Sequence, residues 1–131
     1  MSDAQPEGQP AGQANCVFCR IAAGEIPSAQ VYADSEVIAI RDVNPQAPIH
    51  VLVLPRRHVA GVAELGAGDL GAENTALLGR MVAVANRVAR DDGIAEGGYR
   101  LVINQGHDGG QTVGHLHLHV LGGRPMTWPP G

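Results

Sequence analysis

Apolar and polar positions alternate with period two in several short stretches of the chain, and with helical period in one long stretch. Short runs rich in aliphatic and β-branched residues, bounded by glycine, proline, asparagine or aspartate, are typical of strands. The pattern predicts strands over residues 30–32, 37–41, 49–54, 99–104 and 114–121. Asp34 and Ser35 separate the first two runs and predict a hairpin turn.

One long helix is expected over residues 73–91, where apolar residues recur at helical spacing and Gly93 follows as a stop signal. A short helix is expected over residues 16–24, and another within 61–71. Because strands come in runs and only one helix is long, the architecture predicted is an α+β fold with an antiparallel sheet of about five strands.

The last predicted strand carries three histidines at alternate positions: His115, His117 and His119. Alternation on a strand places all three on one face, with leucine and valine on the other. A single histidine in such a strand is usually a hydrogen-bonded structural residue. Three together would repel one another when protonated, a cost that a structural role does not require. The strand therefore predicts chemistry on an anion or a metal.

Length and composition predict one domain with a polar tail. The 131 residues are 44% hydrophobic, enough for one core. Residues 1–15 are rich in glycine, proline and glutamine and predict a disordered tail without the regions of a signal peptide. No apolar run approaches the roughly 20 residues of a membrane helix, so we expect a soluble cytoplasmic protein. The net charge of −4 and the lack of a basic stripe exclude extended nucleic acid as a partner, but not small phosphorylated ligands.

The glycine-rich loop over residues 105–112 leads into the histidine strand. Glycines let backbone N–H groups approach a phosphate closely, so Gly110 and its neighbour form a candidate anion cradle, or a simple turn. Gln111 and Thr112 add side-chain donors. Asn104 adds another amide donor, or ends the preceding strand as a turn former. From local sequence alone, His50 is a strand residue and Asp42 a turn cap.

Cys16 and Cys19 are the only cysteines, and they are separated by two residues. That spacing lets two thiolates share one zinc ion, which needs two more ligands; His58 and His115 are candidates. A thioredoxin-like redox pair is less favoured because no strand precedes the motif. The third possibility for this pair is two reduced thiols that bind no metal.

The triad segment, residues 115–121, resembles the alternating histidine signature of the histidine triad superfamily. Further segments resemble its nucleotide-binding branch, the HINT proteins: residues 24–27, 42–50, 55–58, 98–100, 108–111 and the tail 122–131, which ends in Trp-Pro-Pro-Gly. The resemblance extends from about Cys16 to the last residue. It implies a HIT-like domain over residues 16–131, and a homodimer whose two sheets join into one.

The resemblance also implies a function. HINT-like proteins bind purine nucleoside 5′-monophosphates and hydrolyse adenosine phosphoramidates and aminoacyl adenylates. His117 matches the nucleophile that becomes nucleotidylated, and water then releases the monophosphate. The catalytic residues implied are His117, His119, His50, Thr112 and His115. Asn104, Gly110, Gln111 and Thr112 match phosphate contacts along with His117 and His119.

Other residues match the nucleoside site of the family. Asp42 corresponds to the acceptor of the ribose hydroxyls, and Trp128 to a residue that reaches toward the partner's site. The base pocket implied is apolar: Phe18, Ile21, Ile26, Ile40 and Val43. Two positions depart from the animal members, which have serine in place of Thr112 and histidine in place of Arg41.

The cysteine pair resembles bacterial relatives that hold a structural zinc with two cysteines and two histidines. The ligands implied here are Cys16, Cys19, His58 and His115, and no organic cofactor is expected. Two other functions stay open. One is a dinucleoside polyphosphate hydrolase, a branch that lacks the Trp-Pro-Pro-Gly ending. The other is a nucleotide- or partner-binding protein whose catalysis is incidental.

Overall fold

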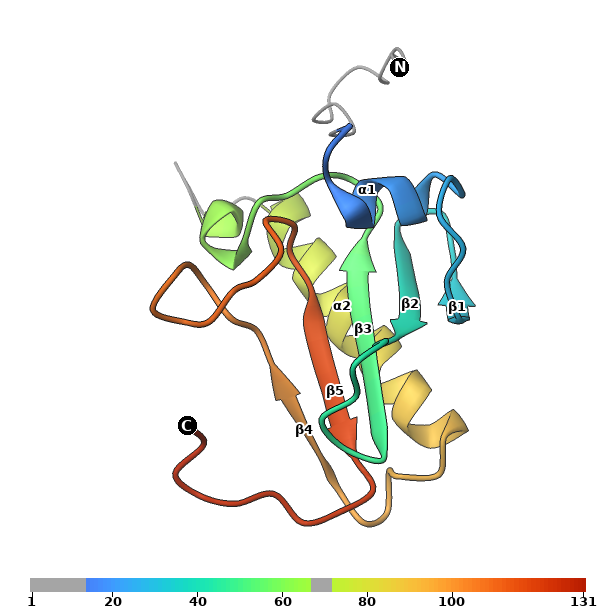
Figure 1. The fold of residues 1–131 in the computed structure, drawn as a ribbon, viewed down its shortest axis with the longest axis vertical. Coiled ribbons are helices and arrows are strands. Elements are labelled where there is room, and N and C mark those ends of the chain that lie inside the picture. Colours follow the sequence, from blue (N-terminus) through green and yellow to red (C-terminus); the bar gives the residue numbers. More distant parts are fainter. Residues whose placement is uncertain (1–13, 67–71) are drawn as a thin grey trace.

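The computed structural model describes residues 14–66 and 72–131. In this part of the chain five strands form one sheet in the order β1-β2-β3-β5-β4, and every neighbouring pair is antiparallel (Figure 1). The strands are β1 (Gln30–Ala33), β2 (Val37–Arg41), β3 (Ile49–Pro55), β4 (Tyr99–Val102) and β5 (Leu118–Gly122). The predicted α+β class and antiparallel sheet are confirmed.

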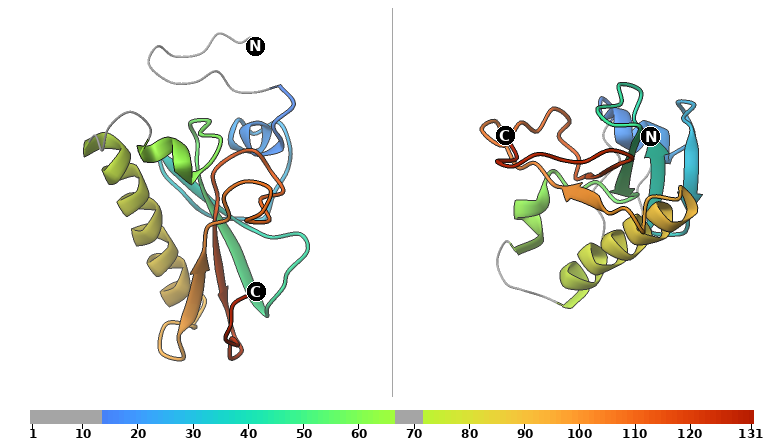
Figure 2. Two further views of the ribbon diagram at one scale, coloured as in Figure 1. Left: turned by 90° about the vertical axis from the view of Figure 1, so that its left-hand side faces the viewer. Right: turned by 90° about the horizontal axis from the view of Figure 1, so that it is seen from below.

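Two helices lie on opposite faces of this sheet (Figure 2). The long helix α2 (Ala72–Asp91) packs on one face, and Gly93 follows it with φ +77°, as the stop signal predicts. The short helix α1 (Val17–Ala22) covers the upper end of the other face. None of the described helices is long and apolar enough to cross a membrane.

Two predicted segments lie partly outside the described residues. Within residues 61–71 the structure has a 3₁₀ helix, η1 (Val62–Gly66), and residues 67–71 are not described. Residues 1–13 of the predicted tail are not described either, whereas Ala14 and Asn15 form a turn before α1.

Alternation along the strands divides the core into two clusters. In β3, Val51 and Val53 pack in the cluster under α2, while Leu52 and Leu54 pack on the side of α1 with Phe18. All four β3 side chains are at most 6% exposed. The sheet is thus buried on both faces at its centre, which holds the neighbouring β5 rigidly.

The histidine strand is shorter than predicted, since β5 begins at Leu118 rather than at residue 114. The neighbouring strand β3 ends at Pro55, which has no N–H for the ladder. The Leu116 N–H instead donates to the Val59 carbonyl at 2.6 Å. β4 also ends early, at Val102, so Asn104 lies in the loop that follows.

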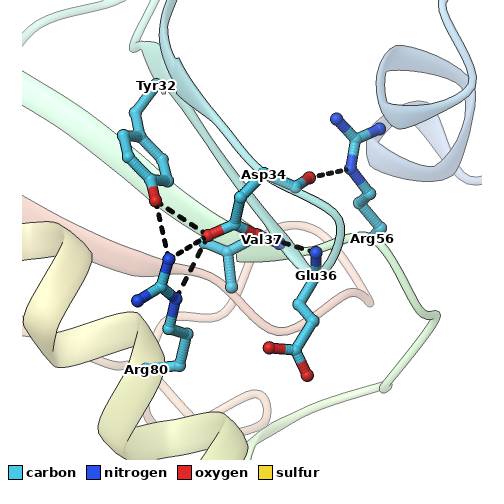
Figure 3. A network of polar contacts seen from close by, with 6 residues as sticks. All are labelled: Tyr32, Asp34, Glu36, Val37, Arg56 and Arg80. Carbon is cyan, nitrogen blue, oxygen red and sulfur yellow. Dashed lines mark hydrogen bonds and ion pairs between the residues drawn. The ribbon is translucent and has the colours of Figure 1, made fainter.

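The predicted turn between β1 and β2 is present, and Asp34 ties it to α2 (Figure 3). Its Oδ1 accepts the backbone N–H groups of Glu36 and Val37 at 2.7 and 2.8 Å. Its Oδ2 accepts the Tyr32 hydroxyl at 2.8 Å and the Arg80 guanidinium at 2.6 Å. Desolvation acts to raise the pKa of the Asp34 carboxyl, but these donors outweigh it and hold the pKa well below its ordinary range.

Candidate active site

The three histidines share one face, as their alternation predicts, although only His119 lies within β5. Leu116, between the first two, is 1% exposed in the core cluster under α2. On the other face the His117 ring lies 5.0 Å from the His119 ring and 5.1 Å from the Phe18 ring, centroid to centroid. The backbone before β5 bends at residues 113–115, yet the His115 ring also lies on this face, 5.8 Å from the Phe18 ring, centroid to centroid.

His117 has its proton placed by the backbone. Its Nδ1 lies 2.7 Å from the His115 carbonyl oxygen, which only accepts hydrogen bonds, so Nδ1 carries the hydrogen. A neutral His117 then has an unprotonated Nε2. The side chain is 6% exposed, and its packing against Phe18 limits the orientation of the ring. This is the form of imidazole that acts as a nucleophile.

A chain of hydrogen bonds also determines the tautomer of His119. The Gln46 N–H donates to His50 Nδ1 at 3.0 Å, so the hydrogen of a neutral His50 is on Nε2. His50 Nε2 lies 2.9 Å from His119 Nδ1 and donates to it. A neutral His119 therefore carries its own hydrogen on Nε2.

The Nε2 atom of His119 is buried and has no hydrogen-bond partner among the described residues. Burial first, and then the neighbouring His117 and His50 imidazoles, lower the pKa of His119 to about 4. His119 is therefore neutral at pH 7, with a single N–H left over beside His117. A buried unpaired donor is costly, and a bound anion would satisfy it.

Asp42 adds a carboxylate next to this pair of histidines. Its Oδ2 lies 3.3 Å from His50 Nε2, and its Oδ1 accepts the Asn44 N–H at 2.8 Å. The side chain is 18% exposed and accessible from outside. Arg41, next to it in sequence, turns away and pairs with Asp92 at 2.6 Å, so the Arg41 guanidinium does not reach this group.

The glycine loop before β5 is braced by its own amides. The Gln111 Nε2 group donates to the Ala60 and Val113 carbonyls, and its Oε1 accepts the Gly106 N–H at 2.9 Å. Both polar atoms of the side chain of Gln111, a predicted phosphate ligand, are thus engaged, within the loop and with Ala60. Gly110 has φ +80°, a conformation that other residues adopt rarely.

Thr112 is exposed at the end of this loop. A hollow of about 390 Å³ opens between Thr112, Val113 and His58. Asn104, the other predicted polar ligand of the phosphate, is half-buried after β4.

The predicted base pocket is brought together only in part. Phe18, Ile21 and Ile40 belong to the same apolar cluster beside α1. Ile26 is half-buried after α1 and is not part of that cluster. Val43 is 100% exposed.

Trp128 lies on the C-terminal segment and is 81% exposed. The Arg100 guanidinium lies 5.9 Å from the centre of its ring and donates to the Thr127 carbonyl at 2.8 Å. These contacts hold the C-terminal segment against the edge strand β4.

The four predicted metal ligands converge at one point. The ligand atoms of Cys16, Cys19, His58 and His115 all lie within 4.8 Å of one another. Cys19 Sγ is 3.2 Å from His58 Nδ1 and 3.5 Å from His115 Nδ1, and Cys16 Sγ is 3.4 Å from His115 Nδ1. In a tetrahedral zinc site a thiolate sulfur and an imidazole nitrogen are about 3.6 Å apart.

The protonation states of His58 and His115 also favour binding of a cation by this cluster. His115 is wholly buried, and its Nε2 lies 2.8 Å from the Pro55 carbonyl, so Nε2 carries the hydrogen and Nδ1 faces the sulfurs with a lone pair. Burial lowers the pKa of His115 to about 4 and also lowers the pKa of His58. Both rings are therefore neutral and able to coordinate a metal.

Residues 23–126, which contain the whole triad, match the HIT domain family. The chain belongs to the HIT family. One relative is the purine nucleoside phosphoramidase of Escherichia coli K12, which is 47% identical over 110 residues that span 84% of this chain and 88% of that protein.

Solved HIT structures have the same fold. A HIT family hydrolase from Legionella pneumophila superposes with a TM-score of 0.81 at 47% identity, covering 89% of this chain and all of that chain. A zinc-bound histidine triad family protein from Mycobacterium smegmatis superposes with a TM-score of 0.68 at 34% identity, covering 84% of this chain and 76% of that chain.

Two backbone groups that shape this HIT site could not be predicted from the sequence. The Gln46 N–H and the Pro55 carbonyl each determine a histidine tautomer through the backbone. A backbone group is present at every position, so the residue type gives no signal. Only the two prolines in the loop before β3, Pro45 and Pro48, which restrict the chain there, hint that residues 44–48 have a fixed conformation.

Proposed function

We propose that this protein is a hydrolase that converts purine nucleoside 5′-phosphoramidates, and aminoacyl adenylates, to nucleoside monophosphates through a covalent nucleotidyl-His117 intermediate. The observation that carries the proposal is the pairing of an unprotonated Nε2 on His117 with a buried, unpartnered Nε2–H on His119. A nucleophile next to a donor for the phosphoryl oxygen is what displacement at phosphorus requires. The Escherichia coli phosphoramidase, at 47% identity, supports the choice of substrate.

The reaction divides into two displacements. The His117 Nε2 lone pair attacks the α-phosphorus; a P–N bond to the imidazole forms as the P–N bond to the leaving amine breaks, and the amine takes a proton from water. Water then attacks the same phosphorus, the bond to His117 breaks, and the monophosphate leaves. His119 Nε2–H donates to a non-bridging oxygen in both steps and stabilises the negative charge there.

The rest of the ligand is held by surrounding groups in this proposal. Asp42 accepts from the ribose hydroxyls through Oδ2, because its Oδ1 already accepts the Asn44 N–H and the side chain is 18% exposed. Asn104 donates to the phosphate. The Gly110 N–H is bonded to the His107 carbonyl at 3.0 Å, so Gly110 contributes to the phosphate site through the turn that its positive φ allows. Gln111 acts by bracing the loop, because its amide is already bonded within it. Thr112 lies on the side of the leaving amine, next to the hollow by His58.

The base is placed against the apolar cluster beside α1, which includes Phe18, Ile21 and Ile40. Ile26 and Val43, which the resemblance also implies, lie outside that cluster and would contact the base only at its margin. The apolar surface of the cluster suits a purine and contributes little discrimination between adenine and guanine.

We also propose that Cys16, Cys19, His58 and His115 hold a structural zinc. The short sulfur–nitrogen distances and the lone pair on His115 Nδ1 support this assignment. When bound, the ion would crosslink α1 to the segment before β5 and would take no part in bond breaking. Coordination requires reduced cysteines, which is consistent with our expectation of a cytoplasmic location.

A homodimer completes the proposal. The outer edge of β4 is unpaired within the described sheet, and Trp128 beside it is 81% exposed. An exposed tryptophan next to an unpaired strand edge is suited to contact with a second copy of this chain. Sedimentation of the purified protein at twice the monomer mass would support the dimer, and a monomer at micromolar concentration would rule it out.

Hydrolysis of adenosine 5′-phosphoramidate tests the enzymatic proposal. His117→Ala should lower the rate of AMP release by at least about 10³-fold, because it removes the nucleophile. AMP should still bind, since the other donors are retained. His107→Ala, which truncates an exposed histidine in the glycine loop, is the matched control and should keep full activity.

Three results would contradict the assigned nucleophile or favour another function. Equal rates for wild type and His117→Ala would refute the assigned nucleophile. AMP binding without turnover by the wild type would favour the nucleotide-binding protein. Faster cleavage of diadenosine polyphosphates than of the phosphoramidate would favour the dinucleoside polyphosphate hydrolase.

A further inference from the structure

One hydrogen in the site is close to two acceptors but bonded to only one of them. His50 Nδ1 accepts the Gln46 N–H, so the hydrogen of the neutral ring is on Nε2. That Nε2 is hydrogen-bonded to His119 Nδ1 at 2.9 Å, whereas Asp42 Oδ2 lies 3.3 Å from it without forming a hydrogen bond. At this distance the negative charge of Asp42 still attracts the positively polarised hydrogen. Asp42 therefore weakens the hydrogen bond from His50 to His119.

Doubly protonated and metal-bound states of His50 conflict with the geometry. A doubly protonated His50 would direct an Nδ1–H at the Gln46 N–H, which is itself a donor. Burial also lowers the pKa of His50, although Asp42 partly opposes the shift. A metal ion between Asp42, His50 and His119 would need a lone pair on His50 Nε2, where the hydrogen lies. The state that remains is the neutral ring whose Nε2–H is bonded to His119 beside the Asp42 carboxylate.

We propose that Asp42 is a positioning residue that couples recognition of the ribose to His119: a hydroxyl that donates to Asp42 Oδ2 offsets the charge that attracts the His50 Nε2–H and so strengthens the bond of that N–H to His119 Nδ1. The inference rests on the proposed function for the location of the ribose. Asp42 Oδ2 is the oxygen that can take a hydroxyl donor, since the side chain is 18% exposed and the Asn44 N–H is bonded to Oδ1.

The proposal implies that the sugar affects the rate of catalysis. A stronger bond to Nδ1 orients the His119 ring and keeps its hydrogen on Nε2, where the phosphoryl oxygen needs it. Ribose hydroxyls should therefore raise kcat in addition to lowering KM. One neutral hydrogen bond of this kind corresponds to a factor of about 3 to 10.

Nitrogen-15 NMR of the histidine side chains tests the coupling without catalysis. Saturating adenosine should move the His119 Nδ1 and His50 Nε2 resonances in the directions of a stronger mutual hydrogen bond. 2′,3′-Dideoxyadenosine should not. The same shifts with both nucleosides, no shift with adenosine, or failure of adenosine to bind would each overturn the proposal.

Asp42→Asn provides the matching variant. The Asn44 N–H should retain the amide oxygen at the Oδ1 position, which places an NH₂ group, not an acceptor, toward His50. This variant should show the adenosine-bound shifts without any ligand. Asp91→Asn removes a carboxylate from an exposed pair with Arg87 and should behave as wild type.

Kinetics provide the second test. With the wild type, 2′,3′-dideoxyadenosine 5′-phosphoramidate should have a kcat about 3- to 10-fold below that of the ribose substrate. In Asp42→Asn the two kcat values should become equal within about twofold, because the carboxylate charge is gone. A wild-type sugar effect on KM alone, or an unchanged kcat ratio in the variant, would overturn the proposal.

The two tests separate this inference from the proposed function. A wild type that fails to hydrolyse the ribose substrate refutes the hydrolase, and the NMR titration then still decides whether Asp42 controls the His50–His119 hydrogen bond. Active enzyme with nucleoside-independent shifts refutes the coupling alone.

Discussion

Replacement of His58 by glutamine is the sharpest test of the zinc site. His58 is half-buried, with its Nδ1 3.2 Å from Cys19 Sγ and its ring 5.1 Å from the His115 ring. Glutamine retains much of the side-chain volume but does not provide an imidazole nitrogen at this position. His58→Gln should therefore leave three ligands and a weaker site with little loss of packing.

The expected magnitude follows from mass action. At free zinc about 100-fold above its Kd, binding stabilises the folded wild type by about 2.7 kcal/mol. Partners outside the ligand shell alone change metal affinity by about 10–100-fold, so loss of a direct ligand should weaken it at least about 100-fold. At the same free zinc the variant gains only about 0.4 kcal/mol. The difference of about 2.3 kcal/mol corresponds to roughly 9 °C in Tm for a domain of this size.

Two measurements on the same samples check this expectation. Elemental analysis should find about one zinc per chain in the wild type and well below one in His58→Gln. Thermal unfolding should show the difference in Tm in buffered zinc and a much smaller one with a chelator in excess. His107→Gln, at an exposed histidine outside the cluster, should match the wild type in both conditions.

The outcome that refutes the reasoning is equally specific. If His58→Gln lowers Tm by the same amount with chelator as with zinc, the histidine stabilises the fold by packing and does not act through the ion. Unchanged zinc content in the variant would remove His58 from the ligand set.

Three further predictions concern pH, the turn and the loop. The folded-state pKa values of His115 and His119 are about 4, below their unfolded value of about 6.5, so the unfolded metal-free chain binds more protons and stability falls with falling pH, by about 1.8 kcal/mol from each of the two histidines between pH 7 and 5 in denaturant titrations. A flat profile would contradict the neutral rings. Asp34→Asn should lower the free energy of unfolding by about 1–3 kcal/mol, because it weakens the bonds to Arg80 and to the turn; urea unfolding measures this. Gly109→Ala would place a Cβ against the Gln105 carbonyl oxygen, too close for a normal contact, and should reduce turnover through displacement of the loop; unaltered kinetics would count against the role of that loop.

Local pattern was sufficient for most of the fold. Side-chain alternation and helical spacing predicted the strands, α2 and the turn at Asp34, because each depends on steric preferences of neighbouring residues. The ends of β4 and β5 were wrong by two and four residues. Where a strand ends depends on whether the neighbouring strand has a backbone N–H or carbonyl free for the next hydrogen bond. Pro55 of β3 has no N–H to donate to the segment before β5.

The sequence by itself determined which chemistry is available: three alternating histidines, a pair of cysteines at metal-binding spacing and a glycine loop. The common face of His117 and His119 also follows from the sequence, because period two holds along extended backbone. His115 lies in a bend, so its position on that face depends on the tertiary packing around it.

The tertiary structure decided what those groups do together. It brings Cys16 within 3.4 Å of His115, 99 positions away, and it places each hydrogen through a backbone partner: the His115 carbonyl for His117, the Pro55 carbonyl for His115, and the Gln46 N–H for His50. Tautomers and metal geometry depend on distances of a few tenths of an ångström between distant segments. Local sequence preferences carry no information about such distances, which arise only when the sheet and its two packed faces are assembled.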